Sequence, residues 1–191
     1  MGEQHTDAYE VLDEEGHKTG KILDRDTVHK QELWHEVANV WIMNSQGEVL
    51  LQLRGPSMEL APNVWDVAIG THVRPNEDPT FAAQRCLQTE FGLVVHPDKL
   101  KHLFNIRSSN PVGQGVVHRT VGHVFLLKQD VNISDIHVDP AKIVRLEWRS
   151  PEIVMAEIGS TETSASYFPR AGNYYAQLFD ALAAETGLSR P

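Results

Sequence analysis

The chain has 191 residues, a formal net charge of -9 and a single cysteine. Its length suits one domain with a substantial core, and its acidic balance argues against a general nucleic-acid-binding surface, which needs a basic footprint. One cysteine excludes an internal disulfide, and no apolar run approaches the ~20 residues of a membrane-spanning helix. We therefore expect a cytoplasmic protein without a nucleic-acid or membrane partner.

The first third of the chain begins with a weak two-residue alternation. Residues 10–12 and 21–23 predict a short hairpin, because glycines and polar residues lie between them. The polar stretch over residues 24–34 predicts a helical turn that leads into the sheet. We interpret residues 1–34 as an N-terminal hairpin and lead-in, and residues 35–191 as the main domain.

The rest of the chain contains β-type runs around one well-marked helix. Strands are expected over residues 35–44, 48–54, 65–69, 100–107, 116–128 and 143–148. Ser150 and Pro151 predict the start of a short helix, since serine is a good cap and proline fits the first helical position. Apolar residues at helical spacing predict a last helix within residues 167–185. These elements predict an α/β (α+β) fold.

The stretch over residues 65–93, WDVAIGTHVRPNEDPTFAAQRCLQTEFGL, combines a buried strand, a tight loop and a helix. Asp78 can cap the helix, because its carboxylate accepts hydrogen bonds from the free amides of the first turn. Pro79 suits the first helical position, and Gly92 can adopt the left-handed conformation that ends a helix. The predicted helix therefore extends from Pro79 to Phe91.

This loop–helix unit resembles the Nudix box, G-x5-E-x7-R-E-U-x-E-E-x-G-U, over residues 71–93. In that register Glu77 stands at the first glutamate, Arg85 at the arginine and Glu90 at the last glutamate. The sequence departs from the pattern at three positions, which hold Thr71, Cys86 and Thr89. The resemblance implies a Nudix-type α/β/α sandwich with a mixed central sheet and the N-terminal hairpin in front of it.

The box implies a metal site on one face of the helix. Positions 86, 89 and 90 are spaced i, i+3 and i+4, so they share that face. Three carboxylates there would bind Mg²⁺ or Mn²⁺ and neutralise a diphosphate, but Glu90 is the one carboxylate among the three. In the family the residue at Arg85 pairs with a carboxylate and holds the unit together. Glu90, Glu77 and Arg85 are therefore the catalytic candidates, and Glu90 is also a metal candidate.

Over roughly residues 9–150 the chain also resembles isopentenyl-diphosphate isomerases and related bacterial Nudix proteins. The shared features are His35, Trp41, Asn44, Gly47, Arg54, Pro62, Trp65, Gly70 and His72. The isomerases hold a metal with three histidines and two glutamates and transfer protons with a cysteine and a glutamate. Gly70 occupies the cysteine position and Thr120 a glutamate position. Isomerase activity is therefore not our leading hypothesis, because the acid–base pair is missing.

Histidines nevertheless gather at the positions of the isomerase metal site. His35 and His72 match two of its ligands, and the third falls at Val28, one residue before His29. We expect His35, His72 and His118, with His29 as a further candidate, to converge on an ion such as Zn²⁺ or Mn²⁺. In the alternative interpretation they are ordinary polar residues at strand ends.

Other candidates are less specific. Arg54 and Arg74 are expected to contact a substrate phosphate, or else to be solvated surface arginines, and Trp65 is a third candidate for substrate binding. Cys86 is interpreted as a small packed side chain rather than a redox thiol. Glu157 is a candidate catalytic base, because Nudix enzymes often recruit one from a late segment.

The sequence leaves three functions open. The leading hypothesis is a metal-dependent hydrolase of a small diphosphate metabolite, such as a nucleoside diphosphate linked to another group. The second is a degenerate Nudix module that binds a diphosphate without efficient chemistry, as the residues at 86 and 89 would allow. The third is an isomerase-like enzyme that uses the histidines. A homodimer is a further expectation, since relatives are often dimers.

Overall fold

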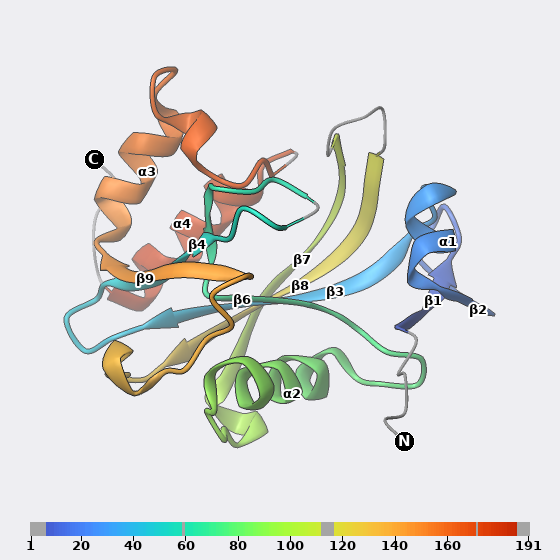
Figure 1. The fold of residues 1–191 in the computed structure, drawn as a ribbon, viewed down its shortest axis with the longest axis horizontal. Helices are drawn as coiled ribbons and strands as arrows, with labels where there is room; N and C mark the ends of the chain where they lie inside the picture. Colours follow the sequence, from blue (N-terminus) through green and yellow to red (C-terminus); the bar gives the residue numbers. More distant parts are fainter. Residues whose placement is uncertain (1–6, 59, 112–116, 171, 187–191) are drawn as a thin grey trace.

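A computed structural model describes residues 7–58, 60–111, 117–170 and 172–186 (Figure 1). The strands are β1 (Ala8–Leu12), β2 (Lys18–Asp24), β3 (His35–Met43), β4 (Val49–Arg54), β5 (Trp65–Val67), β6 (Ile69–His72), β7 (Leu100–Pro111), β8 (Val117–Lys128) and β9 (Ile143–Arg149). The helices are α1 (Arg25–Lys30), α2 (Pro79–Phe91), α3 (Pro151–Gly159) and α4 (Tyr174–Thr186). Short 3₁₀ turns lie at Pro97–Lys99, Ile133–Asp135 and Ser164–Ser166.

The main sheet is mixed and divides at its centre. Its strand order is β5-β4-β3-β8-β7, with β6 also paired to β3 and β9 also paired to β4. β3 and β8 run parallel, and β3 and β4 pair at Met43 and Val49, beside the turn that joins them. Beyond that turn β3 pairs with β6, whereas β4 pairs with β5 and β9. The two halves therefore diverge and leave room between them for a site.

Helices cover both faces of this sheet, which confirms the predicted sandwich. α2 lies below the sheet in Figure 1, and α3 and α4 lie on the other side of it. The alternation of side chains along β3 explains both layers: Ala38, Val40 and Ile42 pack in the core that includes α2, whereas Trp41 and Met43 pack in the core with α3 and α4. A strand with apolar residues on both faces is buried on both sides.

The limits of α2 agree with the prediction at both ends. The Asp78 side chain accepts a hydrogen bond from the Thr80 amide at 2.8 Å, and Pro79 is the first helical residue. Gly92 has φ 71°, which is the left-handed conformation that ends the helix. Ala83, Leu87 and Phe91 are buried under the sheet. Local chemistry therefore fixes the helix that carries Glu90.

Several predicted elements have different limits in the structure. The expected strand at 65–69 is two strands, because Ala68 separates β5, which pairs with β4, from β6, which pairs with β3. The expected strand at 100–107 continues to Pro111, and residues 112–116, which follow it, lie outside the described residues. The last helix begins at Tyr174 rather than near residue 167.

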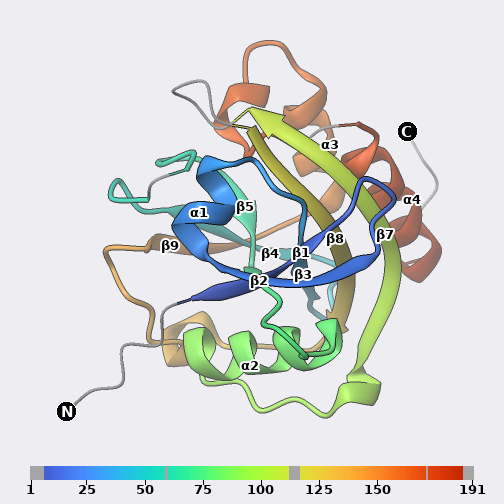
Figure 2. The same cartoon turned by 90° about the vertical axis from the view of Figure 1, so that its right-hand side faces the viewer.

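The N-terminal hairpin forms as predicted, with longer strands. Tyr9 of β1 pairs with Leu23 of β2, and Leu12 forms a bridge to Trp34 just before β3. Tyr9, Val11 and Val28 form a small core of their own. Figure 2 shows the hairpin and α1 side by side at one end of the main sheet. The division of the chain at residue 34 stays a prediction.

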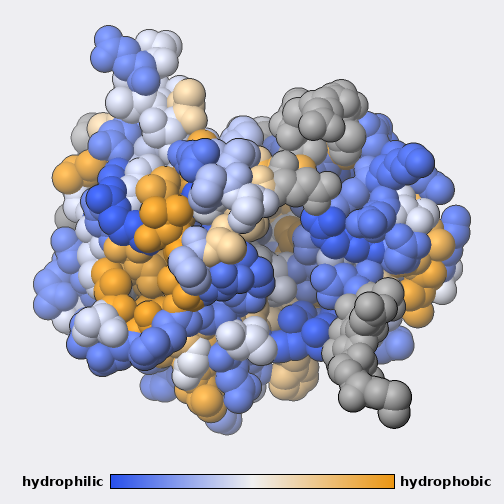
Figure 3. Space-filling view, viewed as in Figure 1, coloured by the Kyte–Doolittle hydropathy of each residue, from blue (hydrophilic) through white to orange (hydrophobic). Residues whose placement is uncertain are grey.

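The hydropathy of the surface differs between the two sides of the molecule in the orientation of Figure 1. Figure 3 shows a hydrophobic patch toward the left of this view and a mainly hydrophilic right half. Large apolar side chains exposed in the described residues include Val144 of β9 and Ile153 of α3. None of the described helices is long and apolar enough to cross a membrane. The expected homodimer stays a prediction.

Candidate active site

A cavity of about 380 Å³ lies where the two halves of the sheet diverge. Its wall includes Glu90 and Cys86 of the box helix, His72 of β6 and His118 of β8. Four cationic side chains also line it, namely Arg25, Arg54, Lys142 and Arg170, together with the carboxylates of Asp7 and Asp66. The cavity therefore brings together the box, the histidines and several cations.

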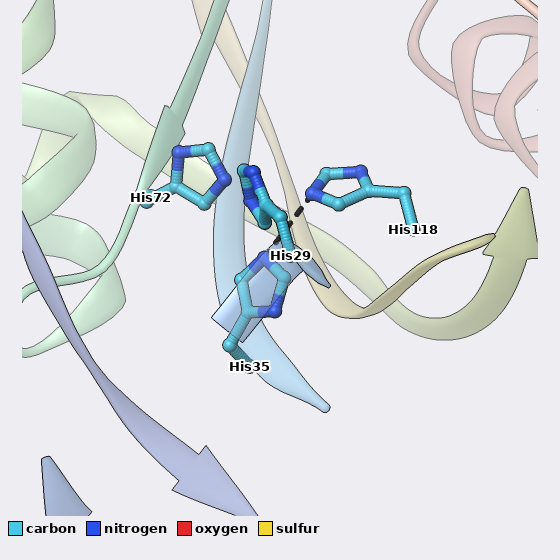
Figure 4. Close-up of side chains that lie close together, drawn as sticks. All are labelled: His29, His35, His72 and His118. Carbon is cyan, nitrogen blue, oxygen red and sulfur yellow. Dashed lines mark hydrogen bonds between the residues drawn. The ribbon is translucent and has the colours of Figure 1, made fainter. Parts of the chain in front are cut away.

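Four histidines from four elements meet beside this cavity, as Figure 4 shows. His29 comes from α1, His35 from β3, His72 from β6 and His118 from β8. One ring nitrogen of each lies within 4.8 Å of those of the others, and Nε2 of His35 lies 3.2 Å from Nε2 of His118. The strand register explains the meeting, because Val37 pairs with His72 and His35 pairs with Thr120, two residues from His118. We call these residues the histidine cluster.

Burial keeps His35, His72 and His118 of the histidine cluster uncharged. Desolvation lowers the pKa of His35 to about 4 and the pKa of His118 to about 3, with neighbouring histidines lowering the latter further. The pKa of His72 is also lowered well below its ordinary value, mainly by burial. Nδ1 of His35 lies 2.9 Å from the Leu33 carbonyl, which can only accept, so the proton stands on Nδ1 and the Nε2 lone pair faces the cluster.

Neutral imidazoles with inward lone pairs are suitable ligands for a metal ion. The buried Nε2 of His72 has no hydrogen-bond partner among the described residues, which leaves it free to bind an ion. Nitrogen ligands suit Zn²⁺ and other late transition ions better than Mg²⁺, which prefers oxygen. The donors of the histidine cluster therefore fit a borderline ion.

The fourth histidine of the cluster, His29, lies one residue after the position that the resemblance to the isomerases implied. Position 28 was expected to match the third ligand, but Val28 is fully buried in the small N-terminal core. His29 instead faces the other three histidines, with its ring 4.8 Å from that of His118. The amphipathic spacing of α1 explains this, because neighbouring helical residues point in different directions.

The brace of the box is formed as the resemblance implied. Nε of Arg85 donates to Glu77 Oε1 at 2.7 Å, and Nη2 donates to Oε2 at 2.9 Å and to the carbonyl of His72 at 3.1 Å. Burial alone would raise the pKa of Glu77, but hydrogen bonds from Arg85 and from the Arg74 amide lower it overall. The bidentate pair therefore ties the loop and α2 to the strand that carries His72.

The metal-binding face of the box helix is poor in ligands. Glu90 lines the cavity, and Nζ of Lys142 lies 3.5 Å from its Oε1. Cys86 is buried, and burial raises the pKa of its thiol to about 11, so it packs as a neutral group as predicted. Thr89 is exposed. One carboxylate with a lysine partner does not fit a cluster of Mg²⁺ ions, which needs several oxygen ligands.

The remaining candidates are divided between the cavity and other regions. Arg54 lines the cavity, whereas Arg74 is exposed and, like Trp65, is not among the lining residues. Trp65 is buried in the other core, with the guanidinium of Arg149 at 4.3 Å from its ring. Glu157 binds Arg149 and Tyr167 and is likewise not among the lining residues. Roles in substrate binding for Arg74 and Trp65 therefore gain no support from the geometry.

Sequence reasoning missed several residues of the cavity. Arg170 and Asp66 form a buried ion pair in its wall, and Tyr9 stacks on His72 with ring centroids 4.3 Å apart. Asp66 has a signal in the sequence, since it is a lone carboxylate within an apolar strand. Arg170 has none, because it follows a loop and its partner is 104 residues away.

The divided mixed sheet, the capped box helix and its Glu77–Arg85 brace define a Nudix-type domain. The NUDIX domain family matches residues 33–171. The chain therefore belongs to the Nudix family, and the fold predicted from the box is confirmed.

Relatives include both hydrolases and isomerases. The chain is 31% identical over 105 residues to Nudix hydrolase 3 of Arabidopsis thaliana, covering 54% of this chain and only 13% of that protein. It is 27% identical over 157 residues to an isopentenyl-diphosphate Delta-isomerase of Citrobacter koseri, covering 78% of this chain and 81% of that protein. The structure of DR0079 from Deinococcus radiodurans is similar with a TM-score of 0.67 and 25% identity, covering 91% of this chain and 97% of the other. The family match and the relative that is named a Nudix hydrolase support the prediction of a Nudix hydrolase.

Proposed function

We propose that the protein is a metal-dependent hydrolase of a small diphosphate metabolite, and that its metal is held by the histidine cluster. The observation that carries this proposal is one cavity wall that joins this cluster to Glu90 and to several cationic side chains. Neutral histidines leave the charge of a bound divalent ion uncompensated, so this end of the cavity would attract a polyanion.

The residues of the site have separate roles in this proposal. Water attacks one phosphorus of the substrate, the bridging P–O bond breaks, and the second phosphate leaves with its substituent. A divalent ion at the histidine cluster would supply Lewis acidity toward a phosphate oxygen. Glu90 lines the same cavity and can accept the proton of the water, while Glu77 and Arg85 hold its helix in place. Arg25 and Lys142 contribute positive charge that binds the diphosphate.

A catalytically degenerate binding module is the second candidate. The observation that favours it is the presence of Cys86 and Thr89 where the box has carboxylates. The isomerase alternative is supported less, because Gly70 and Thr120 line the cavity where a thiol and a carboxylate would be needed.

The proposal is tested by metal analysis and a substrate panel. The protein is purified without a histidine tag and its bound metal is measured, with about one ion per chain expected. Nucleotide sugars, dinucleotides, nucleoside triphosphates and prenyl diphosphates are then assayed with Zn²⁺, Mn²⁺ and Mg²⁺, before and after chelation. Hydrolysis that is lost on chelation and restored by the ion supports the proposal.

Two other outcomes contradict it. Hydrolysis that survives complete removal of metal would exclude a metal-dependent reaction. No hydrolysis across the panel, together with thermal stabilisation by one of its members, would identify a binding module instead.

A further inference from the structure

A second set of charged residues lies in the cavity wall, away from the histidine cluster. Nη1 of Arg54 donates to Asp66 Oδ2 at 3.1 Å, and Nη2 of Arg170 donates to the other oxygen of the same carboxylate. We call Arg54, Asp66 and Arg170 the inner charge cluster. All three side chains are nearly buried, with 11%, 6% and 12% of their surfaces exposed.

The inner charge cluster carries one more positive than negative charge within the described residues. Two guanidinium groups share a single carboxylate, and both also lie against the ring of Phe168, at 5.0 Å and 4.7 Å from its centroid. Burial alone would lower the pKa of Arg170, but Asp66 raises it above its ordinary value, so this arginine stays charged. An unbalanced buried charge costs free energy unless an anion accompanies it.

The two arginines are not equivalent. Arg54 is held by the main chain, because its Nε donates to the carbonyl of Ala61 at 2.9 Å and its Nη2 to that of Leu60 at 2.8 Å. Arg170 has an unused hydrogen-bond donor, because its buried Nε has no hydrogen-bond partner among the described residues. Its Nη1 makes a long contact of 3.4 Å with Asn39, and its guanidinium also lies 4.8 Å from the ring centroid of Tyr174 and bonds to the Tyr175 side chain. Arg170 is therefore the member with capacity left for a ligand.

The register of β3 places the inner charge cluster close to the histidine cluster, at a separation of two strand residues. His72 pairs with Val37, and Asn39, which contacts Arg170, lies two residues farther along the same face of β3. Two residues of a strand span about 7 Å, and Val37, Asn39 and His72 all line the cavity. This separation suits two linked phosphates, one at each end.

We propose that Arg170 binds the phosphate of the substrate that does not face the histidine cluster, and so selects diphosphates over monophosphates. This proposal rests on the proposed function and adds a specificity-determining residue to it. Arg54 and Asp66 position Arg170, and the second phosphate balances the excess charge of the inner charge cluster. A monophosphate would occupy one end of the cavity and leave that charge unbalanced.

Calorimetric titration of the full, metal-containing chain with inorganic diphosphate and with inorganic phosphate tests this inference. Arg170→Lys keeps the charge but loses the planar fork, and Arg107→Lys is the matched control because Arg107 stacks on Trp34 at 4.2 Å outside the cavity. We expect Arg170→Lys to weaken diphosphate binding by about 10- to 100-fold, with phosphate binding and the control nearly unchanged. Metal content is measured after each titration, because diphosphate itself binds metal ions.

A second variant keeps the test decisive if Arg170→Lys folds poorly. Asn39→Asp has nearly the same shape and adds the missing negative charge beside Arg170. We expect it to raise the melting temperature of the ligand-free protein and to weaken diphosphate binding by about 10-fold. Diphosphate binding equal to that of the unmodified protein in Arg170→Lys, or in Asn39→Asp where Arg170→Lys does not fold, would overturn the inference, even where metal binding and hydrolysis are intact. Absence of metal and of hydrolysis in the unmodified protein would instead overturn the proposed function.

Discussion

The box helix and the histidine cluster both contribute side chains to the cavity wall, but they differ in how many groups they offer to a metal ion. The helix keeps its caps, its brace and its packing, yet offers a single carboxylate that is paired with Lys142. The histidine cluster instead brings one ring nitrogen from each of four different elements together, within 4.8 Å of one another. In the proposed function, the family scaffold is thus preserved while the metal ligands come from the histidine cluster instead of the box helix.

The difference also concerns the kind of ion. Carboxylates on a helix suit Mg²⁺, whereas buried imidazoles suit a borderline ion and bring no negative charge. Without that negative charge, the charge of the proposed ion would be neutralised by the proposed diphosphate substrate. The surplus of cations in the cavity wall is consistent with this role of the substrate.

The largest effect is expected from removing a member of the histidine cluster. His72→Ala should reduce metal affinity by more than about 100-fold and abolish hydrolysis, because loss of even an outer partner of a ligand typically costs 10–100-fold. Glu90→Gln should leave metal content unchanged. Elemental analysis after dialysis, with hydrolysis measured in parallel, distinguishes the two regions.

The control for this variant is His102→Gln, since His102 is exposed and contacts Asn105 outside the cavity. The comparison is reversed if Glu90→Gln loses its metal and His72→Ala keeps it. In that case the helix would be the metal site and the histidines ordinary polar residues.

A smaller effect is expected from restoring the box. Cys86→Glu with Thr89→Glu places three carboxylates on the face that now carries only Glu90, and should raise Mg²⁺ affinity by about 10-fold or more. Isothermal titration with Mg²⁺ measures the gain, and Thr89→Glu alone is the control because that position is exposed. Hydrolysis that appears only in the double variant would identify the natural protein as a binding module. No gain in Mg²⁺ affinity would show that three carboxylates on this helix face are not oriented to bind one ion together.

Much of the fold could be predicted because its signals are local. Asp78, Pro79 and Gly92 fix α2 through hydrogen bonds and backbone preferences within a few residues. The split of the strand at Ala68 could not be foreseen, because it depends on β5 and β6 pairing with different strands. Pairing between distant strands leaves little trace in a short apolar run.

Less of the candidate site than of the fold could be predicted from local sequence signals. His35, His72 and His118 were found through a family resemblance and not through their spacing, and His29 was displaced by one position from that alignment. Arg170 was missed because nothing near it in the sequence indicates a buried cation. Its role follows from Asp66 and Asn39, which lie more than a hundred residues earlier.

The smallest effect is expected from weakening the brace that joins the two regions. Glu77→Gln removes the charge that holds Arg85, which itself donates to the carbonyl of the metal candidate His72. The free energy of unfolding at pH 7 should fall by about 1–2 kcal/mol, since the pair is partly solvated and charged hydrogen bonds contribute modestly. The pKa of Glu77 is lowered in the folded chain, so this stabilisation is present above the unfolded pKa and is lost as pH falls through the folded pKa. Urea unfolding of both proteins at pH 7 and in acid measures this stabilisation. The difference between their free energies of unfolding should become smaller in acid. A difference that does not change with pH would show that the shape of the Glu77 side chain, and not its charge, stabilises the pair.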